Sequence, residues 1–177
     1  PALAVLKVSS NVGVTKIGDL SRCTVLREVD VANCGIHGSF ADNMDTLSSL
    51  VTLDASGHAL LNSTGDLSPF TLLEDLDMAN CNLRGSLSDG IGEMANLETC
   101  NVSGNIDLSA IGDLSPCIHL RVLNVSFCDL QGTLASALGG HLLSLIRCNA
   151  SNNEHLVGLG DLSIYTHMNK LLASDCG

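Results

Sequence analysis

The stretch Leu73-Glu-Asp-Leu-Asp-Met-Ala-Asn-Cys81 decides the fold, because its pattern recurs along the whole chain. The same pattern returns 47 residues later, as Leu120-Arg-Val-Leu-Asn-Val-Ser-Phe-Cys128. Counting from the first leucine as position 0, apolar residues fill positions 0, 3 and 5, and a cysteine fills position 8. Positions 3 and 5 alternate as in a strand, which predicts that both side chains point inward and that position 4 points outward.

The tetrapeptide Gly-Asp-Leu-Ser marks a longer period. It begins at Gly18, Gly65, Gly112 and Gly160, at intervals of 47, 47 and 48 residues. We therefore divide the chain into double units 3–49, 50–96 and 97–144 and a partial unit 145–177, all within one domain that covers residues 1–177. Neither end has the polar cap that protects the last core layer of a solenoid, so we expect a fragment of a longer solenoid.

Each double unit contains two halves with the same pattern, so the chain holds eight copies, which we call coils one to eight. Coils one to eight begin at Leu3, Leu26, Leu50, Leu73, Leu97, Leu120, Leu145 and Met168. Position 8 is Asn or Cys in every coil except coil three, where His58 predicts a locally altered turn. The copies resemble the LxxLxLxxN/C motif of the leucine-rich repeat family, and the resemblance covers essentially every residue. The alternation of two repeat types is reminiscent of protozoan members of that family.

The resemblance implies an α/β solenoid, a right-handed superhelix of about eight coils with a parallel sheet on its concave side. Short helices or 3₁₀ turns are expected on the convex side. In the second halves, apolar spacings of three and four, as in Leu134, Leu138 and Leu142, predict a short helical turn. In the first halves, Gly-Asp-Leu-Ser predicts a tight, 3₁₀-like turn capped by Asp or Ser.

Composition excludes several classes of protein. The net charge is −11, and Lys and Arg do not cluster as phosphate neutralisation requires, so we expect no nucleic-acid partner. There is no run of about 18 apolar residues, so we expect no membrane span. Hydrophobic residues make up 45% of the chain, which favours a folded core over disorder.

The cysteines and the glycosylation sequons indicate different compartments. Cys34, Cys81, Cys128 and Cys176 share position 8 two coils apart, which is about 10 Å at the usual strand spacing. A disulfide needs Cα atoms within about 7 Å, so we predict eight free thiols, which slightly favours a cytoplasmic setting. Sequons favour an extracellular or cell-surface setting, and Asn62, in a predicted loop, is the best acceptor if the chain is secreted.

Metal, cofactor and catalytic motifs are not found. The six histidines, including His141, are scattered, and there is no CxxC, HExxH or closely spaced His pair, so we expect no bound metal or other cofactor. There is no Walker loop or Gly-x-Gly-x-x-Gly motif. The repeat explains nearly every Asp and Ser, and we therefore expect no enzymatic activity.

The outward-pointing residues of the predicted strands form the candidate binding surface. Coils two to four are acidic there, coils five and six are neutral, and basic residues return in coils seven and eight. Like charges on adjacent strands repel, so we predict that a basic segment of a protein partner binds the acidic part; a merely solvated polar face is the alternative. Phe127 is a candidate anchor residue, unless it packs against its own loop. The candidate partner-binding residues are Glu28, Asp30, Asp54, Asp75, Asp77, Asn101, Asn124, Phe127 and Arg147.

Two functions follow from this interpretation. The chain is either a protein-interaction module that binds its partner through the concave face, or a structural component of a larger cytoskeletal or cell-surface assembly. The partner and the oligomeric state stay open at this point.

Overall fold

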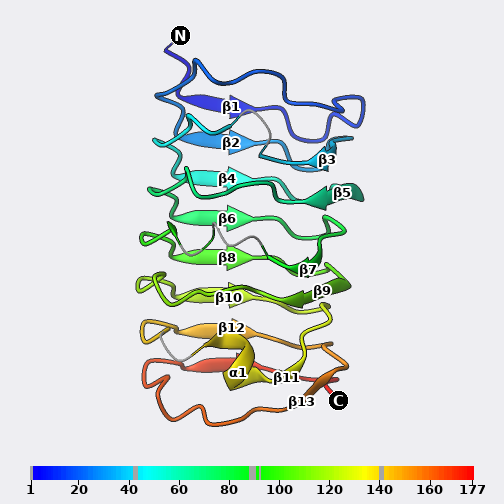
Figure 1. The fold of residues 1–177 in the computed structure, drawn as a ribbon, viewed down its shortest axis with the longest axis vertical. Helices are drawn as coiled ribbons and strands as arrows, with labels where there is room; N and C mark the ends of the chain where they lie inside the picture. The colour runs from blue at the N-terminus through cyan, green and yellow to red at the C-terminus, as the bar shows by residue number, and fades with distance from the viewer. Residues whose placement is uncertain (1, 42–43, 88–90, 92, 140–141) are drawn as a thin grey trace.

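Eight short parallel strands form one sheet that runs the length of the molecule (Figure 1). The computed structural model describes residues 2–41, 44–87, 91, 93–139 and 142–177. Within these residues, each segment between successive strands of the sheet travels once around the solenoid. The coils predicted from the repeat are thus confirmed, as eight strands joined by seven turns. In spatial order the strands are β1 (Val5–Lys7), β2 (Glu28–Asp30), β4 (Thr52–Asp54), β6 (Asp75–Asp77), β8 (Thr99–Asn101), β10 (Val122–Asn124), β12 (Arg147–Asn149) and β14 (Lys170–Leu172).

The strands align so that equivalent positions of successive coils face one another. Leu53 pairs with Leu76, Leu76 with Cys100 and Cys100 with Leu123, and all four side chains are buried. Leu6 at the first strand packs against the same hydrophobic cluster. The inward direction predicted for positions 3 and 5 is therefore confirmed, and one continuous core runs beneath the sheet.

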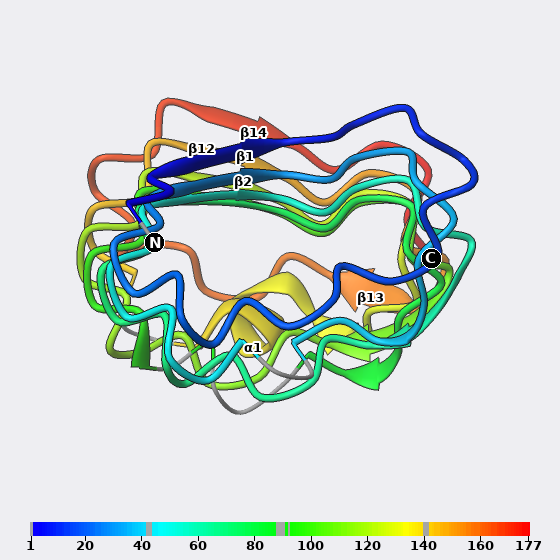
Figure 2. The same ribbon diagram turned by 90° about the horizontal axis from the view of Figure 1, so that it is seen from above.

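The side opposite the sheet includes many turns and, among the described residues, one short helix (Figure 2). Helix α1 (Leu134–Leu138) buries Leu134 and Leu138, and the Thr133 hydroxyl accepts a hydrogen bond from Ser136 N. This helix confirms the helical turn predicted in the third double unit. The corresponding stretches of the first two double units lie partly outside the described residues, at 42–43, 88–90 and 92. His141 also lies outside them.

Three two-stranded parallel sheets on this side were not predicted from the sequence. Each pairs the second half of one double unit with the first half of the next. The glycines that follow the second-half turns have positive φ, and the pairs show a register shift there. The pairs are β3 (His37–Ser39) with β5 (Leu60–Ser63), β7 (Arg84–Ser86) with β9 (Asp107–Ala110), and β11 (Gly132–Thr133) with β13 (Leu156–Gly158).

The position of Asn62 in strand β5 differs from the sequence-based expectation. Asn62 was expected in a loop, but it lies within β5, at the register shift between the pairs Gly38–Leu61 and Ser39–Ser63. The sequence Leu-Leu-Asn-Ser has no alternating apolar pattern to predict a strand, although Leu61 is buried in the core while Leu60 is exposed. The side chain of Asn62 lies outside the described part of the structure.

The Gly-Asp-Leu-Ser turns are capped by aspartate, as predicted. In each copy the Asp Oδ1 accepts a hydrogen bond from the backbone N–H of the serine two residues later, at 2.8–2.9 Å. Consecutive i to i+3 bonds follow, such as Cys23 N to Leu20 O and Leu26 N to Cys23 O. These bonds return the chain to the start of the next strand.

Position 8 forms a ladder of buried groups that hydrogen-bond to the backbone. Asn105 makes four such bonds: Nδ2 donates to Met78 O and Val102 O, and Oδ1 accepts from Cys81 N and Leu83 N. Where the ladder residue is cysteine, the thiol donates to a carbonyl of the preceding coil, as in Cys81 Sγ to Ala55 O at 3.0 Å. All eight cysteines are free thiols in the structure.

His58 occupies a ladder position without disturbing the turn. Leu61 N still donates to His58 O at 3.0 Å, just as Leu108 N donates to Asn105 O at 2.9 Å, so the expectation of an altered turn is wrong. The difference lies in the side chain. Nδ1 of the imidazole lies 3.0 Å from Cys34 O, but the buried Nε2 has no hydrogen-bond partner among the described residues.

Candidate binding surface

The outward side chains of the eight-stranded sheet form two parallel rows, which we call together the sheet face. The register places position 4 of each coil directly beside position 4 of the next, and position 2 beside position 2. The position-4 row is Lys7, Asp30, Asp54, Asp77, Asn101, Asn124, Asn149 and Leu172. The position-2 row is Val5, Glu28, Thr52, Asp75, Thr99, Val122, Arg147 and Lys170.

The structure brings most of the predicted binding residues together in these rows. Asp30, Asp54 and Asp77 are consecutive neighbours, and Asn101 and Asn124 continue the same row. Neighbouring strands lie about 4.8 Å apart, so these three carboxylates repel one another. In the other row Thr52 separates Glu28 from Asp75, and Arg147 lies on β12, well away from the acidic strands.

Asp77 shows the effect of this crowding. Burial of the side chain raises the pKa of its carboxyl group, and the negative charge of Asp54 adds to the rise. Hydrogen bonds from Ala79 N and Asn101 Nδ2 act in the opposite direction without cancelling it. The structure therefore disfavours the charged form of Asp77.

The position-4 residues also have a structural role that the sequence interpretation missed. In coils two to seven, Oδ1 of the Asp or Asn accepts a hydrogen bond from the backbone N–H two residues later, at 2.9–3.3 Å. Either residue type can make this bond, because both carry an acceptor oxygen at the same place. One carboxylate oxygen of each aspartate is therefore committed to the turn after the strand. It is the second oxygen, and the charge, that distinguish Asp from Asn on this surface.

A shallow hollow of about 430 Å³ lies on the sheet face where the acidic and neutral parts meet. Its floor includes the core residues Leu53, Leu76 and Cys100. It extends across four strands from β4 to β10, so it runs along the solenoid axis rather than along one strand. Its rim is formed by Thr52, Asp54, Asp75, Asp77, Thr99, Asn101, Val122 and Asn124.

Basic residues gather toward the C-terminal end of the sheet. Arg147 and Lys170 are adjacent in the position-2 row, and both are exposed. A second hollow of about 270 Å³ lies beside them at the edge where the strands begin, and Arg121 is among its lining residues. The sequence interpretation considered only positions 2 and 4, and it therefore missed Arg121 at position 1. The hollow is also lined by Glu98, His119, Ser144, Ile146 and His167.

Phe127 lies beside the sheet face, just after β10, in a strained backbone conformation. Its φ is +55°, in the left-handed region that bulky residues rarely adopt. The equivalent residue in the other coils is Asn, Gly, Ser or Asp, which tolerate this region more easily: Ser10, Asn33, Gly57, Asn80, Gly104, Asn152 and Asp175. The Phe127 side chain is 56% exposed, so most of it does not pack against its own loop.

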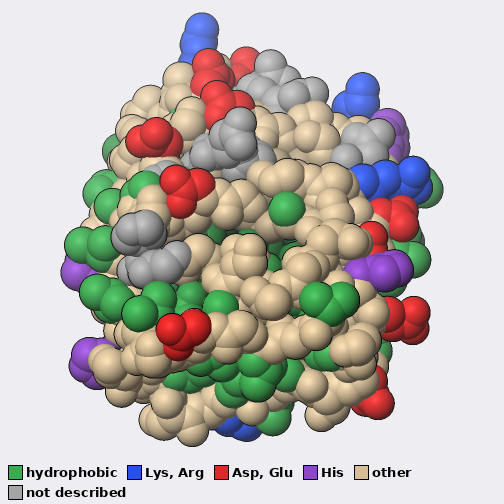
Figure 3. Space-filling model, turned by 60° about the horizontal axis from the view of Figure 1, so that its bottom comes forward, with side chains coloured by type: hydrophobic (Ala, Val, Ile, Leu, Met, Phe, Trp, Pro, Cys, Tyr) green, Lys and Arg blue, Asp and Glu red, His purple; other side chains and the backbone are tan. Residues whose placement is uncertain are grey.

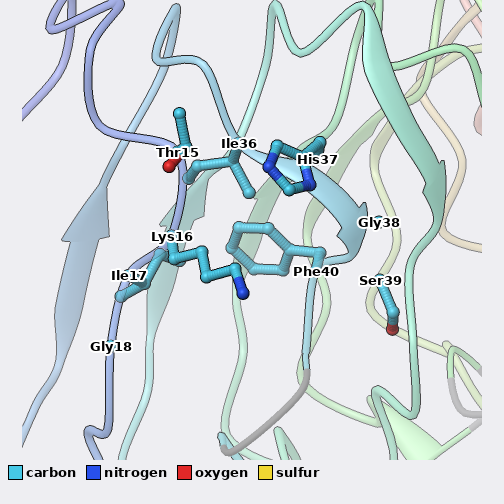
Figure 4. Close-up of a pocket in the computed structure, with 9 residues that line it drawn as sticks. All are labelled: Thr15, Lys16, Ile17, Gly18, Ile36, His37, Gly38, Ser39 and Phe40. Atoms are coloured by element: carbon cyan, nitrogen blue, oxygen red, sulfur yellow. The ribbon is translucent and has the colours of Figure 1, made fainter.

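Charge is distributed differently on the side opposite the sheet (Figure 3). The side opposite the sheet, seen in Figure 3 with the C-terminal end brought forward, carries charged side chains singly or in small groups among hydrophobic and uncharged surface. A hollow of about 360 Å³ lies there between coils one and two (Figure 4). Lys16 and His37 line it, together with Phe40, but it holds no carboxylate.

Comparison with known proteins identifies the repeat. Leucine-rich repeat profiles match residues 72–94 and 117–139, which cover the strand and turn of coils four and six. The chain is a leucine-rich repeat protein.

Solved structures of leucine-rich repeat proteins superpose over nearly all of this repeat protein. LIC12759 from Leptospira interrogans has a TM-score of 0.81 at 15% identity, covering 99% of this chain and 44% of that one. A plant peptide hormone receptor, RGFR1 in complex with RGF2, has a TM-score of 0.80 at 19% identity, covering 99% and 29%. The internalin InlF from Listeria monocytogenes has a TM-score of 0.77 at 19% identity, covering 96% and 47%.

At these identities the matches establish the fold alone. The leucine-rich repeat protein spans less than half the length of each of the three solved chains. No curated protein matches its sequence. The matches give no support to the resemblance with protozoan members, since these three come from bacteria and a plant.

No helix among the described residues is both long and apolar enough to cross a bilayer. No group of three or more His, Cys, Asp or Glu side chains in the described ranges is arranged to hold a metal ion.

Proposed function

We propose that this leucine-rich repeat protein is a protein-interaction module, and that its sheet face binds a basic segment of a partner protein. The observation that carries this proposal is the row Asp30, Asp54 and Asp77. Three carboxylates stand side by side, and none of them forms an ion pair with a described residue of the chain. A charged row of this kind is unfavourable until opposite charge from another molecule reaches it.

The other acidic side chains of the sheet face add to this surface. Glu28 forms an ion pair with Lys7 at 2.5 Å, so its charge is compensated within the chain. Asp75 accepts a hydrogen bond from the Thr99 hydroxyl but has no cation beside it among the described residues. Asp75 therefore belongs with the aspartate row, whereas Glu28 contributes less.

Phe127 is proposed as an apolar anchor beside the charged surface. An exposed aromatic ring in a strained backbone position is unfavourable for the free protein, and such strain is often retained where it serves binding. Aromatic residues are frequent among those that dominate binding energy. Its place on coil six puts it next to the neutral part of the sheet face.

A likeness in fold supports a protein or peptide partner. RGFR1 was solved in complex with RGF2, and RGFR1 is a peptide hormone receptor. Leucine-rich repeats of this kind serve as binding modules, and we propose binding rather than catalysis for this chain as well.

The test uses random nonapeptides displayed on phage or beads and selected on the purified protein. We expect the selected peptides to be rich in Lys and Arg. The matched control is the triple variant Asp30→Asn, Asp54→Asn, Asp77→Asn. Asn101, Asn124 and Asn149 make the same backbone hydrogen bond naturally, so this variant removes charge while keeping the turns. Selection of peptides without basic residues, or equal binding by the triple variant, would refute the proposal.

A further inference from the structure

The sheet face is electrically polarised along its length. Positions 2 and 4 carry five carboxylates in coils two to four and two basic residues in coils seven and eight. Lys7 in coil one also lies on this face and is compensated by Glu28. The carboxylates are Glu28, Asp30, Asp54, Asp75 and Asp77, and the cations are Arg147 and Lys170.

The two charged parts do not neutralise each other. Arg147 and Lys170 form no ion pair with any described residue. From Asp54 on β4 to Arg147 on β12 there are four strand spacings, and Lys170 on β14 lies one spacing further. At about 4.8 Å per spacing this is about 19–24 Å, well beyond the screening length of about 8 Å at physiological salt. Each part is therefore available to an external charge of opposite sign.

We propose that the ligand of this surface is an extended peptide segment with two charged ends. Lys or Arg residues of the segment lie over Asp54 and Asp77, and an acidic group lies over Arg147 and Lys170. An extended chain advances about 3.3 Å per residue, so about six or seven residues separate the two ends. The residues between them are uncharged, because Thr99, Asn101 and Val122 line the intervening surface. This inference rests on the proposed function and specifies its ligand.

Charge complementarity favours a peptide over a second copy of this chain. Two copies placed antiparallel would set five carboxylates against two cations in each half of the interface. Each copy also carries a net charge of −11, so the pair would repel. A peptide segment supplies opposite charge at both ends, and the hollow of about 430 Å³ across β4 to β10 receives its basic end and its uncharged middle, one strand short of Arg147.

The experiment measures binding of fluorescent peptides to the purified protein by anisotropy. The test peptide carries Lys-Arg, then Ser, Ala and Val residues, then Asp, so that six residues separate the charges; it is made in both chain directions. One control peptide replaces Asp with Asn, and another places Asp two residues from the basic pair. We expect the test peptide in one direction to bind about fivefold more tightly than either control, as for an exposed ion pair.

The variant Arg147→Gln, Lys170→Gln separates this inference from the proposed function. Both side chains are exposed, so the fold is expected to be kept. The double variant should bind the test peptide and the Asn control equally, while keeping the affinity for the basic pair that depends on Asp54 and Asp77. Suppose that the wild-type protein binds the test and control peptides equally, and that the triple Asp→Asn variant binds neither. The inference of a ligand with two charged ends is then wrong, and the proposed function stands. If no basic peptide binds in an Asp-dependent way, both are wrong.

Discussion

Asn101 Nδ2 donates a hydrogen bond to Asp77 Oδ2 across neighbouring strands, at 2.9 Å, where the acidic part of the sheet face meets the neutral part. The other oxygen of Asp77 accepts from Ala79 N, also at 2.9 Å. Asp77 is thus held by two hydrogen bonds while burial and Asp54 disfavour its charge. Because these effects on the carboxylate oppose one another, substitutions of Asp77 can separate them.

Replacing Asp77 by Asn and by Ala should change stability in opposite directions at neutral pH. Asn keeps the acceptor for Ala79 N but loses the hydrogen bond from Asn101 Nδ2, because an amide nitrogen replaces the accepting oxygen. The raised pKa shows that the unfavourable charge outweighs these hydrogen bonds, so we still expect a small gain in the free energy of unfolding when the charge is removed. Ala leaves Ala79 N–H without its acceptor, so we expect a loss of about 1 kcal/mol. Urea denaturation of the two variants and the wild type measures both effects. If the Asp77→Ala variant is as stable as the Asp77→Asn variant, the hydrogen bond from Ala79 N contributes nothing to stability.

The gain from Asp77→Asn should depend on pH. The pKa of Asp77 is raised in the folded state from its usual 3.8, so the folded protein binds more protons than the unfolded chain just above pH 3.8. The contribution of Asp77 to stability therefore falls as pH rises through that range. The advantage of the Asn variant should be present at pH 7 and should shrink as pH falls to 3.8 and below. An advantage that is constant between pH 3 and pH 7 would contradict the raised pKa.

His58→Asn should stabilise the protein. His58 makes one side-chain hydrogen bond where Asn105 makes four, and its buried Nε2 is unpartnered among the described residues. Restoring the ladder asparagine should raise the free energy of unfolding by about 1–3 kcal/mol, the usual cost of an unsatisfied buried polar group. Asn105→His is the matched reverse substitution and should destabilise. Denaturation curves that show no gain for His58→Asn would mean that the imidazole is accommodated without cost.

Phe127→Asn should separate stability from binding. Asn80 and Asn152 adopt the same left-handed backbone, so the substitution should relieve strain and raise the free energy of unfolding by about 1 kcal/mol. If Phe127 anchors the partner, the same substitution should weaken binding to selected peptides. Asn80→Phe serves as the control, because it should lower stability without improving binding. Unchanged peptide affinity in Phe127→Asn would remove Phe127 from the binding surface.

The core thiols should resist modification in the native protein. Burial raises the pKa of Cys100 and of Cys148 to about 12, so almost no reactive thiolate is present at neutral pH. We expect both to react with a disulfide reagent only after unfolding in denaturant, as followed by mass spectrometry of the modified peptides. Half-buried Cys176 should react earlier. Rapid native labelling of Cys148 would place that side chain outside the core.

The sequence predicted the sheet and its direction of burial because positions 3 and 5 carry a periodic apolar signal in every coil. Leu76 and Cys100 occupy the same position of the repeat on paired strands, and both are buried, although one side chain is aliphatic and the other is a thiol. The small sheets on the opposite side were missed because residues such as Gly38 and Ser39 are paired through the backbone, which leaves no hydrophobic pattern to detect.

For the candidate surface, the predicted acidic row and its neutral continuation lie where the repeat placed them. Two features of this surface could not be predicted from the repeat pattern. The hydrogen bond from Asp54 Oδ1 to Ser56 N depends on how the backbone turns after the strand. The place of Arg121 in the lining of the second hollow depends on the direction that a position-1 side chain takes at the edge of the sheet. Whether these residues bind a partner stays a prediction.

The small sheets also bear on how such an array changes length. Strand β3 joins its unit to the next through β5, and β7 does the same through β9, at equivalent positions 47 residues apart. Loss of residues 50–96 would bring His37–Ser39 beside Asp107–Ala110, a partner of the same kind as the one removed. Insertion or deletion of a whole period thus preserves every junction, and unequal recombination can lengthen or shorten the gene without inventing a new interface.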